Sequence, residues 1–549
     1  MSAFLLVLCS DAISTVSHRA DLRGRRVGGP VTPLNVAPRH GPACHRGRKG
    51  ARLDFCQPGL PHAGDPPLST SASPASLHLG AAGSPPQSKS GARPALAAVL
   101  LGFFTIMVDA MIVNVALPSI GRGFGSGMTG LQWVVDGYTL AFAAFLLSAG
   151  AISDRIGARQ AFACGLGLFV AASAVCAMAP NLGILVAARL VQGAGAAVVV
   201  PSSLALLRET FPDPAARAKA IALWGVGGSV GAAAGPVAGG LLTLIDWRMI
   251  FFVNLPVGAV ALVLLKRAQP SPRQEVPFDW TGQVAAVATM GALTYAVIEA
   301  GADGFGTAPV LVAFAVAVVA AIVFGAAQAR GRHPMTPLPL LRSRTVALSV
   351  AIGFALNVGF YGMIFLLGLY LQQVHGLSAL ATGMAFLPMT VLTSFMSPVA
   401  ARLATRFGAR MPVISGQLLM AAGLLAMVAV PTDSPAWLSV LLMVPIGAGG
   451  AMAVTALTAL LLEKVPAERA GVASGVLNAA RQLGGALAVA VFGALVADRS
   501  GFVSGLHTSL LIAAATVAVS VIATVLLRAQ VPHRLPATVT DAGPRLLER

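Results

Sequence analysis

Long stretches of this 549-residue chain contain no ionisable side chain. From Val310 to Gln328, for example, nothing is charged or strongly polar before the final Gln. Hydrophobic residues make up 56% of the chain and charged residues only 10%, which is too little charge to cover a soluble surface. About 20 consecutive apolar residues cross a bilayer as one helix, and the runs here are continuous rather than alternating. The sequence therefore predicts an all-α polytopic membrane protein.

We find fourteen apolar segments in the chain, each long enough to cross a bilayer and separated from the next by a short loop. Most of the chain is thus expected to lie in the membrane, with the lipid bilayer as its main surroundings. The predicted spans are residues 95–120, 131–152, 160–179, 182–204, 219–244, 248–265, 281–299, 308–328, 346–371, 379–401, 411–430, 436–461, 471–496 and 503–527.

Residues 1–93 have a different composition from the rest of the chain. They are rich in Pro, Gly, Ser, Arg and His and show no helical periodicity. The apolar start from Ala3 to Cys9 is too short for a signal peptide, and no positive charge precedes it. We interpret this stretch as a disordered N-terminal extension, while an overextended translation start is an alternative that the sequence leaves open.

Basic residues alternate from loop to loop. With the N-terminus in the cytoplasm, the inner loops carry seventeen Lys and Arg residues and the outer loops only Arg122, Arg248 and Arg499. Such an excess is typical of cytoplasmic loops. The pattern predicts a multi-pass protein of the plasma membrane with both termini in the cytoplasm. It also accounts for the net charge of +17 without a nucleic-acid partner.

A weak internal repeat relates the two halves of the chain. The loop after the second span and the loop after the tenth share an R-x-G-x-R pattern, from Arg155 and Arg406, at an offset of 251. Gly193-Ala194-Gly195 and Gly447-Ala448-Gly449 match at an offset of 254. Transporters are commonly built from paired repeats with the binding site between them. The predicted domains are a six-helix bundle over 94–268, a two-helix insertion over 269–335, a second six-helix bundle over 336–528 and a cytoplasmic tail over 529–549.

An ionisable residue inside a membrane span is costly and marks a functional hypothesis, and four such residues stand out. Asp109 is near the middle of the first span and Arg189 is in the fourth, at depths that an Arg side chain can bridge. We predict that they pair and that Asp109 carries a proton, although a purely structural pair is the alternative. Asp136, near the outer interface, has either a structural or a gating role, and it is the next candidate for proton coupling after Asp109. Arg481 shares a polar helix face with Asn478 and Gln482.

The fifth span is rich in glycine, and it also contains Pro236. Glycines four residues apart leave a flat strip on which another helix approaches closely, and a buried proline bends its helix. The combination suggests a pivot between bundles, whereas the glycines alone are explained by packing. The residues concerned are Gly227, Gly231, Gly235, Pro236, Gly239 and Gly240.

Four signatures in these spans and loops are characteristic of one family. From about residue 95 to 527, the chain resembles the fourteen-span drug:proton antiporter branch of the major facilitator superfamily, and within it the actinobacterial exporters of the methylenomycin-resistance kind. Ala158 stands where the family often has a basic residue. The matching residues are Asp109 with Val113 to Pro118; Gly150, Asp154, Arg155, Gly157 and Arg159; Arg189, Gln192, Gly193, Gly195, Ala196 and Ala197; and Gly231, Gly235, Pro236, Gly239 and Gly240, followed by Trp247, Arg248, Phe251, Asn254, Pro256 and Gly258.

The resemblance implies a fold of two six-helix bundles plus two inserted helices and a role for each signature. The loop that contains Gly150, Asp154, Arg155, Gly157 and Arg159 would latch the bundles in the outward-facing state. Arg189 would influence proton exchange at Asp109, and the glycines of the fifth span would mark export rather than uptake. The resemblance thus predicts proton-coupled export of small amphipathic or hydrophobic compounds, such as drugs and antibiotics, by alternating access.

Other classes of protein fit the sequence less well. We find no H-E-x-x-H and no G-x-x-x-x-G-K-[ST] pattern, and five cysteines with no metal spacing, so we expect no enzyme, no metal and no cofactor. A proton-coupled symporter and an exporter of an endogenous metabolite are the open alternatives. We expect a monomer whose partners are protons and a small-molecule substrate. Candidate residues of the substrate cavity are Trp133, Tyr138, Asn357, Tyr361, Asn478 and Arg481.

Overall fold

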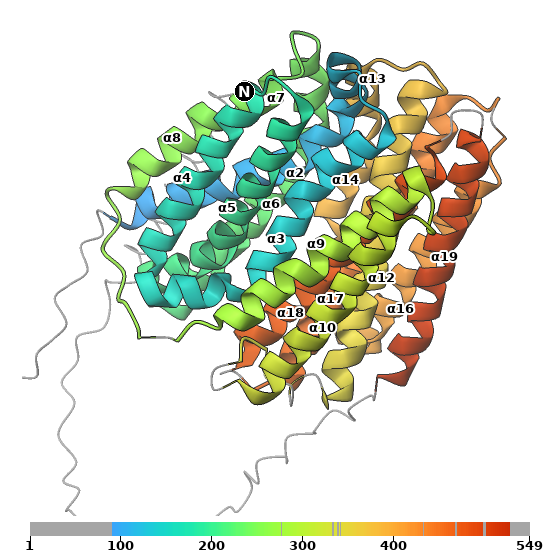
Figure 1. Ribbon diagram of the computed structural model, residues 1–549. Helices are drawn as coiled ribbons and strands as arrows, with labels where there is room; N and C mark the ends of the chain where they lie inside the picture. Colours follow the sequence, from blue (N-terminus) through green and yellow to red (C-terminus); the bar gives the residue numbers. More distant parts are fainter. Residues whose placement is uncertain are drawn as a thin grey trace, which may run out of the picture. The chain divides into compact units, whose positions relative to one another are not determined.

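The computed structural model describes residues 91–275, 277–331, 334–336, 340, 342–431, 433–466, 469–497 and 501–527. The predicted tail over 529–549 and all but the last three residues of the predicted extension over 1–93 lie outside them. All regular elements within the described residues are helices (Figure 1).

Six membrane segments form the N-terminal bundle. The sixth is broken at Val253, three residues before Pro256, because the ring nitrogen of Pro256 cannot donate a hydrogen bond to the carbonyl of residue 252. Asn181 and Asp213 cap α5 and α6 by accepting hydrogen bonds from the backbone N–H groups of Ile184 and Ala216, at 2.9 and 2.7 Å. The helices are α2 (Ala92–Phe124), α3 (Met128–Ile156), α4 (Ala158–Ala177), α5 (Leu182–Thr210), α6 (Pro214–Thr243), α7 (Met249–Phe252) and α8 (Asn254–Leu265).

The remaining eight segments are an inserted hairpin and the C-terminal bundle. Breaks at Phe386 and Phe395 divide the tenth segment, each two or three residues before a proline, Pro388 or Pro398. The hairpin consists of α9 (Trp280–Asp303) and α10 (Ala308–Arg330). The C-terminal bundle consists of α12 (Arg344–Gln373), α13 (Ala379–Ala385), α14 (Leu387–Ser394), α15 (Met396–Phe407), α16 (Met411–Val428), α17 (Ala436–Lys464), α18 (Ala470–Leu495) and α19 (Phe502–Leu526).

The predicted fourteen spans are confirmed. Within the described residues, thirteen helical segments are long and apolar enough to cross a membrane, and the shorter Met249–Leu265 supplies the remaining one. Several helices run farther than their apolar segments predict: α5 reaches Thr210 instead of residue 204, and α15 reaches Phe407 instead of residue 401. Hydropathy falls where polar side chains leave the hydrocarbon, but the hydrogen bonds of the helix continue into the interface.

The internal repeat is visible in the backbone. Gly157 and Gly408, the glycines of the two R-x-G-x-R patterns, follow α3 and α15 with φ of +89° and +90°, a conformation that L side chains rarely adopt. The repeated Gly195 and Gly449 also occupy equivalent places, at close helix crossings with Gly165 and Gly416. The two bundles therefore share both a turn and a helix crossing. The division into domains at residues 268 and 335 stays a prediction.

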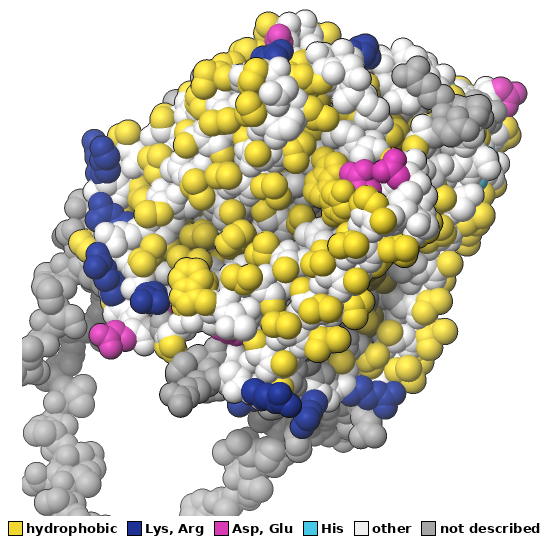
Figure 2. All heavy atoms as spheres, in the orientation of Figure 1, with side chains coloured by type: hydrophobic (Ala, Val, Ile, Leu, Met, Phe, Trp, Pro, Cys, Tyr) yellow, Lys and Arg dark blue, Asp and Glu magenta, His cyan; other side chains and the backbone are white. Residues whose placement is uncertain are grey.

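Basic side chains mark one end of the bundles. We call the end that carries the Gly157 and Gly408 turns the basic end, after Arg155, Arg159, Arg406 and Arg410. Figure 2 shows Lys and Arg side chains gathered along the lower left and the bottom of the view, with a predominantly hydrophobic surface between the ends. Such an apolar band is expected where a surface meets lipid.

Direct contacts join the two bundles in the half away from the basic end. The amide of Gln132, on α3, donates to the backbone carbonyls of Val489 and Ala490 on α18 at 3.2 and 2.6 Å. The amide of Gln372, on α12, donates to the carbonyl of Val115 on α2 at 3.0 Å. These bonds hold the bundles together near the start of α3 and the end of α12, which are the ends of these helices farthest from the basic end.

Candidate functional site

A buried ion pair lies at the centre of the N-terminal bundle. Asp109 on α2 is fully buried and Arg189 on α5 is 2% exposed, and Arg189 Nη1 lies 2.6 Å from Asp109 Oδ2. The pairing predicted for these two residues is therefore present. A charge in this environment is tolerated only when it has partners, and each residue supplies the partner of the other.

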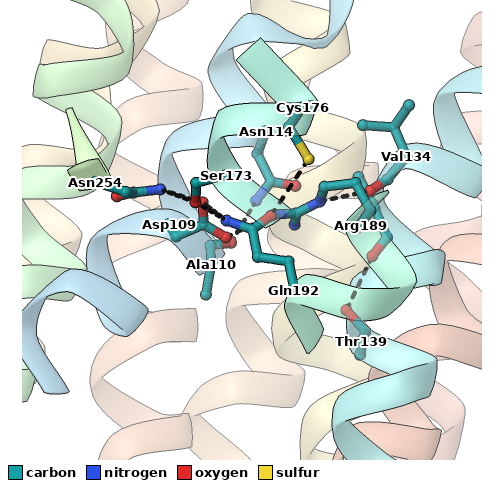
Figure 3. Close-up of polar contacts among 11 residues, drawn as sticks. Asp109, Ala110, Asn114, Val134, Thr139, Ser173, Cys176, Arg189, Gln192 and Asn254 are labelled. Atoms are coloured by element: carbon teal, nitrogen blue, oxygen red, sulfur yellow. Dashed lines mark hydrogen bonds and ion pairs between the residues drawn. The ribbon is translucent and has the colours of Figure 1, made fainter. Parts of the chain in front are cut away.

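Uncharged side chains complete the shell around Asp109 (Figure 3). Its Oδ1 accepts hydrogen bonds from Gln192 Nε2 and Asn254 Nδ2, both at 2.9 Å, and both amides also reach Ser173 Oγ. Arg189 donates to Gln192 Oε1 at 2.7 Å and, through Nε, to the carbonyl of Val134 at 3.1 Å. Five helices thus contribute to one network: α2, α3, α4, α5 and α8. The carboxylate has a donor on each oxygen, so its charged form is well accommodated.

Three members of this network were not among the predicted site residues. Gln192 and Asn254 belong to family signatures, and Gln192 follows Arg189 by three residues, which places both on one face of α5. That spacing was a usable signal. Ser173 on α4 carries no such signal, because a single serine in an apolar segment is common and its partners come from other helices.

A small cavity of about 30 Å³ lies where the two bundles meet. The guanidinium of Arg189 lies 4.3 Å from the centre of the Tyr138 ring, and both side chains line the cavity. Tyr361, predicted to be a substrate residue, lines it from α12. The cavity therefore joins the ion pair of one bundle to polar groups of the other. Its polar lining consists of Asn114, Tyr138, Thr139, Arg189, Tyr361 and Gln482.

Asp136 on α3 contrasts with Asp109. It is fully buried, and neither carboxyl oxygen has a hydrogen-bond partner among the described residues. It follows Gln132 by one turn on the face of α3 that contacts α18. Asp136 therefore lies on the side of α3 that faces α18, and no group in the described part of the chain donates a hydrogen bond to its carboxyl oxygens.

The C-terminal bundle contains its own polar cluster. Arg481 on α18 donates through Nη1 to Asn478 Oδ1 at 3.0 Å and through Nε to Asn357 Oδ1 on α12 at 3.3 Å. The three predicted cavity residues are thus in contact with one another. Both partners are neutral amides, so the charge of Arg481 is oriented but not neutralised.

Trp133 lies apart from the other predicted cavity residues. Its indole Nε1 donates to Glu299 Oε1 at 3.3 Å, and its ring centre lies 6.1 Å from that of Tyr295 on α9. It lines an apolar groove of about 1040 Å³ among α3, α4, α5, α9 and α10. The face of α3 that carries Trp133 is turned toward the hairpin, about 140° in helix rotation from the face that carries Tyr138. The structure therefore does not bring Trp133 to the central cavity.

The loop after α3 contacts the connector between α8 and α9. Asp154 and Arg155 are exposed at the end of α3, and no atom lies within 4 Å of the Cβ position of Gly150. Arg159 donates to the carbonyls of Leu265 and Lys266 at 3.3 and 3.0 Å, and its backbone N–H donates to Ser271 Oγ at 2.9 Å. The backbone of Asp154 also accepts a bond from Gln274 N–H at 2.9 Å. Sequence analysis did not single out this connector.

The glycine face of α6 has two neighbours. Gly231, Gly235 and Gly239 lie against the backbone of α2, where an added Cβ would come within 3.0 Å of a carbonyl oxygen. Gly240 instead lies against Leu380 and Ala379 of α13, in the other bundle, and the carbonyl of Pro236 lies against Gly383. The signature therefore packs one helix of its own bundle and one of the opposite bundle.

No group of three or more His, Cys, Asp or Glu side chains arranged to hold a metal ion occurs in the described part of the chain.

Comparison with known proteins identifies the family to which this fold belongs. A family model described as Major Facilitator Superfamily matches residues 99–489. The chain belongs to the major facilitator superfamily. The fold of two six-helix bundles with an inserted pair of helices, predicted from the resemblance, is confirmed, and the protein is a multi-pass membrane protein of a transporter family.

Two relatives and one solved structure illustrate the match. The chain is 39% identical over 407 residues to the "Multidrug resistance protein Stp" of Mycobacterium tuberculosis, covering 73% of this chain and 75% of that one. It is 35% identical to the "Methylenomycin A resistance protein" of Streptomyces coelicolor, covering 76% of this chain and 88% of that one. A bacterial homolog of the human lysosomal transporter Spinster, in an inward-facing conformation, matches with a TM-score of 0.58 at 19% identity, covering 80% and 97%. The last likeness concerns the fold alone.

Proposed function

We propose that this protein exports small amphipathic or hydrophobic compounds, such as drugs and antibiotics, in exchange for protons. The names of its relatives, a multidrug resistance protein and a methylenomycin A resistance protein, support export of such compounds. The cavity between the bundles combines apolar and aromatic side chains with amide groups and Arg189, a lining that such substrates require, and its volume of about 30 Å³ must widen to admit one. The substrate and the proton are its partners, and it acts as a monomer.

Asp136 is the proton carrier in this proposal, and the contrast with Asp109 is the observation on which it rests. A charged carboxylate that lacks a hydrogen-bond donor costs several kcal/mol in a dry interior, so the neutral acid is the form that fits at Asp136. Asp109 has three donors and fits as a carboxylate. A rearrangement at the α3–α18 boundary would hydrate Asp136 and release its proton. The Asp109–Arg189 pair orients Tyr138 and the cavity wall beside it.

The basic end faces the cytoplasm in this proposal, in agreement with the positive-inside rule. The contacts of Gln132, Gln372 and Gly240 then close the outer side, and the cavity opens inward. Both termini are cytoplasmic, and the membrane is the plasma membrane.

The loop with Gly150, Asp154, Arg155, Gly157 and Arg159 is the latch of the opposite, outward-facing state. Asp154 and Arg155 are exposed here, which leaves both side chains available to the second bundle when the basic ends approach. The bonds of Arg159 to the connector hold the loop in place before the second bundle approaches it.

The test is substrate-induced proton release from vesicles that contain the full chain. A growth-inhibition screen of a sensitive host, beginning with methylenomycin A, identifies a substrate. Asp136→Asn keeps the shape of the side chain but cannot exchange a proton, so it should abolish proton release and pH-driven export while substrate–substrate exchange continues. Wild-type protein in the same vesicles is the reference.

The matched variant is Asp109→Asn, which should lower export by disturbing the network and yet retain proton release for each substrate moved. If Asp109→Asn loses proton release and Asp136→Asn keeps it, Asp109 carries the proton instead. If neither variant changes release, Glu299 is the next acidic residue to test. Export that is insensitive to the pH gradient in wild type contradicts proton coupling altogether.

A further inference from the structure

Arg481 has hydrogen-bonding capacity that its neighbours do not use. A guanidinium carries five N–H donors in a planar fork. Two of its nitrogen atoms, Nε and Nη1, bond to the amide oxygens of Asn357 and Asn478, and no bond is recorded from Nη2 among the described residues. The side chain is only partly buried. One edge of the fork is therefore held in place by amides, and within the described residues no partner occupies Nη2, which can bind another group.

The positive charge of Arg481 has no protein counter-ion in the described residues. The salt bridges found there are Arg189–Asp109 and Arg248–Asp246. The described residues of the C-terminal bundle contain two acidic side chains, Asp433 and Glu463, and both are exposed near helix ends. Arginine within a membrane protein is costly and normally faces a partner or a water-filled pathway.

The position of Arg481 connects it to the central cavity. It precedes Gly485 by one turn of α18, and Asn478 precedes Gln482 by one turn, so the four residues share one side of the helix. Gln482 and Gly485 line the cavity, together with Tyr361 from the helix that supplies Asn357. The Arg481 cluster therefore lies beside the cavity, on the side nearer the basic end.

We propose that Arg481, held by Asn357 and Asn478, binds the anionic group of the transported compound, so that the substrate class is amphipathic organic anions, in particular carboxylates. The proposal rests on the export function proposed above and names the substrates of that same site. A carboxylate matches the planar fork and neutralises a charge that the bundle leaves open. Tyr361, four residues beyond Asn357, offers an aromatic surface to the apolar part of the same molecule.

Isothermal titration calorimetry on the full chain in detergent tests this assignment. The probes are 2-naphthylacetate and its methyl ester, which differ in charge but share the aromatic ring, and heats from empty micelles are subtracted. Wild type should bind the carboxylate at least about tenfold more tightly than the ester, as expected for a charge-assisted bond. Arg481→Gln should remove that preference while ester binding persists, which also shows that the variant is folded. Arg481→Lys should retain part of the preference, because it keeps the charge and loses the fork.

Arg469→Gln is the matched control, since it removes one charge from the exposed start of the same helix and should leave the preference intact. The proposal is overturned if wild type shows no preference for the carboxylate or binds neither probe, or if Arg481→Gln keeps the preference. It is also overturned if Arg481→Gln weakens carboxylate and ester equally, since that result assigns Arg481 a structural role. Proton-coupled export of an uncharged compound by Arg481→Gln would support the proposed export function, whichever result the titration gives. The two proposals are therefore tested separately.

Discussion

The two bundles share a backbone design but differ in the charges they bury. Gly193 and Gly195 of the first bundle correspond to Gly447 and Gly449 of the second, and all four are buried in close helix crossings. At the same offset of 254, however, Arg189 corresponds to Met443 and Gln192 corresponds to Ile446. Both apolar residues are fully buried. The glycines thus serve the fold in both halves, whereas Arg189 and Gln192 are replaced by apolar residues at the equivalent positions of the second bundle.

This difference indicates that the fold does not require the ion pair. Buried ion pairs are seldom more stable than well-packed apolar residues of similar volume, because desolvation offsets much of their attraction. The second bundle packs methionine and isoleucine at the equivalent positions. A reason other than packing is therefore needed for Asp109 and Arg189, and the adjoining central cavity supplies one.

The largest expected effect on stability comes from replacing only one member of the ion pair by the residue at the equivalent position of the second bundle. Arg189→Met leaves Asp109 without its cation and should lower the free energy of unfolding by about 3–5 kcal/mol. Replacing Asp109 by Leu in the same chain should recover most of that loss, because no buried charge then remains. Thermal unfolding of the purified proteins in detergent measures both. A double variant no more stable than the single one would show that packing, rather than the unpaired charge, causes the loss.

A smaller effect is expected where the bundles agree. Gly195→Ala and Gly449→Ala each introduce a Cβ into a helix crossing and should each destabilise the protein by about 1–3 kcal/mol. Gly167→Ala on α4 is the control, since nothing lies within 4 Å of its Cβ position and little loss is expected. The same thermal unfolding experiment measures the loss of stability in each of these variants. Clearly unequal losses at residues 195 and 449 would contradict the shared packing.

The smallest effect separates the two repeated turns. Gly157→Ala and Gly408→Ala force a Cβ into a backbone with positive φ, at a cost of about 1–2 kcal/mol each. Gly157 should lose more, because the carbonyl oxygens of Ser271 and Pro272 lie 3.1 and 3.2 Å from its Cβ position and Gly408 has no such neighbour. Limited proteolysis of the 266–275 connector should also quicken only in Gly157→Ala. Equal proteolysis in both variants would indicate that the connector is held independently of the turn.

Most of the fold could be predicted from the sequence. Water is absent from the hydrocarbon, so each span must satisfy its backbone internally, and an apolar segment of sufficient length is almost obliged to be a helix. The repeat was also visible, because turns such as those at Gly157 and Gly408 need glycine wherever they occur. The interruptions at Val253, Phe386 and Phe395 were not predicted as breaks, since hydropathy remains high across them and the proline effect is local.

The sequence by itself determined the number of spans, their order and the pairing of the two halves, and it identified Asp109, Asp136, Arg189 and Arg481 as candidates for a functional role. Only the tertiary structure decided what each of these side chains touches. Asp109 is surrounded by donors from other helices, Asp136 has none among the described residues, and Trp133 faces the hairpin rather than the cavity. The physical reason is that a buried side chain finds its partners on helices that are distant in the chain. Small differences in the rotation and crossing of those helices then decide whether a carboxyl group meets an arginine, an amide or only apolar atoms.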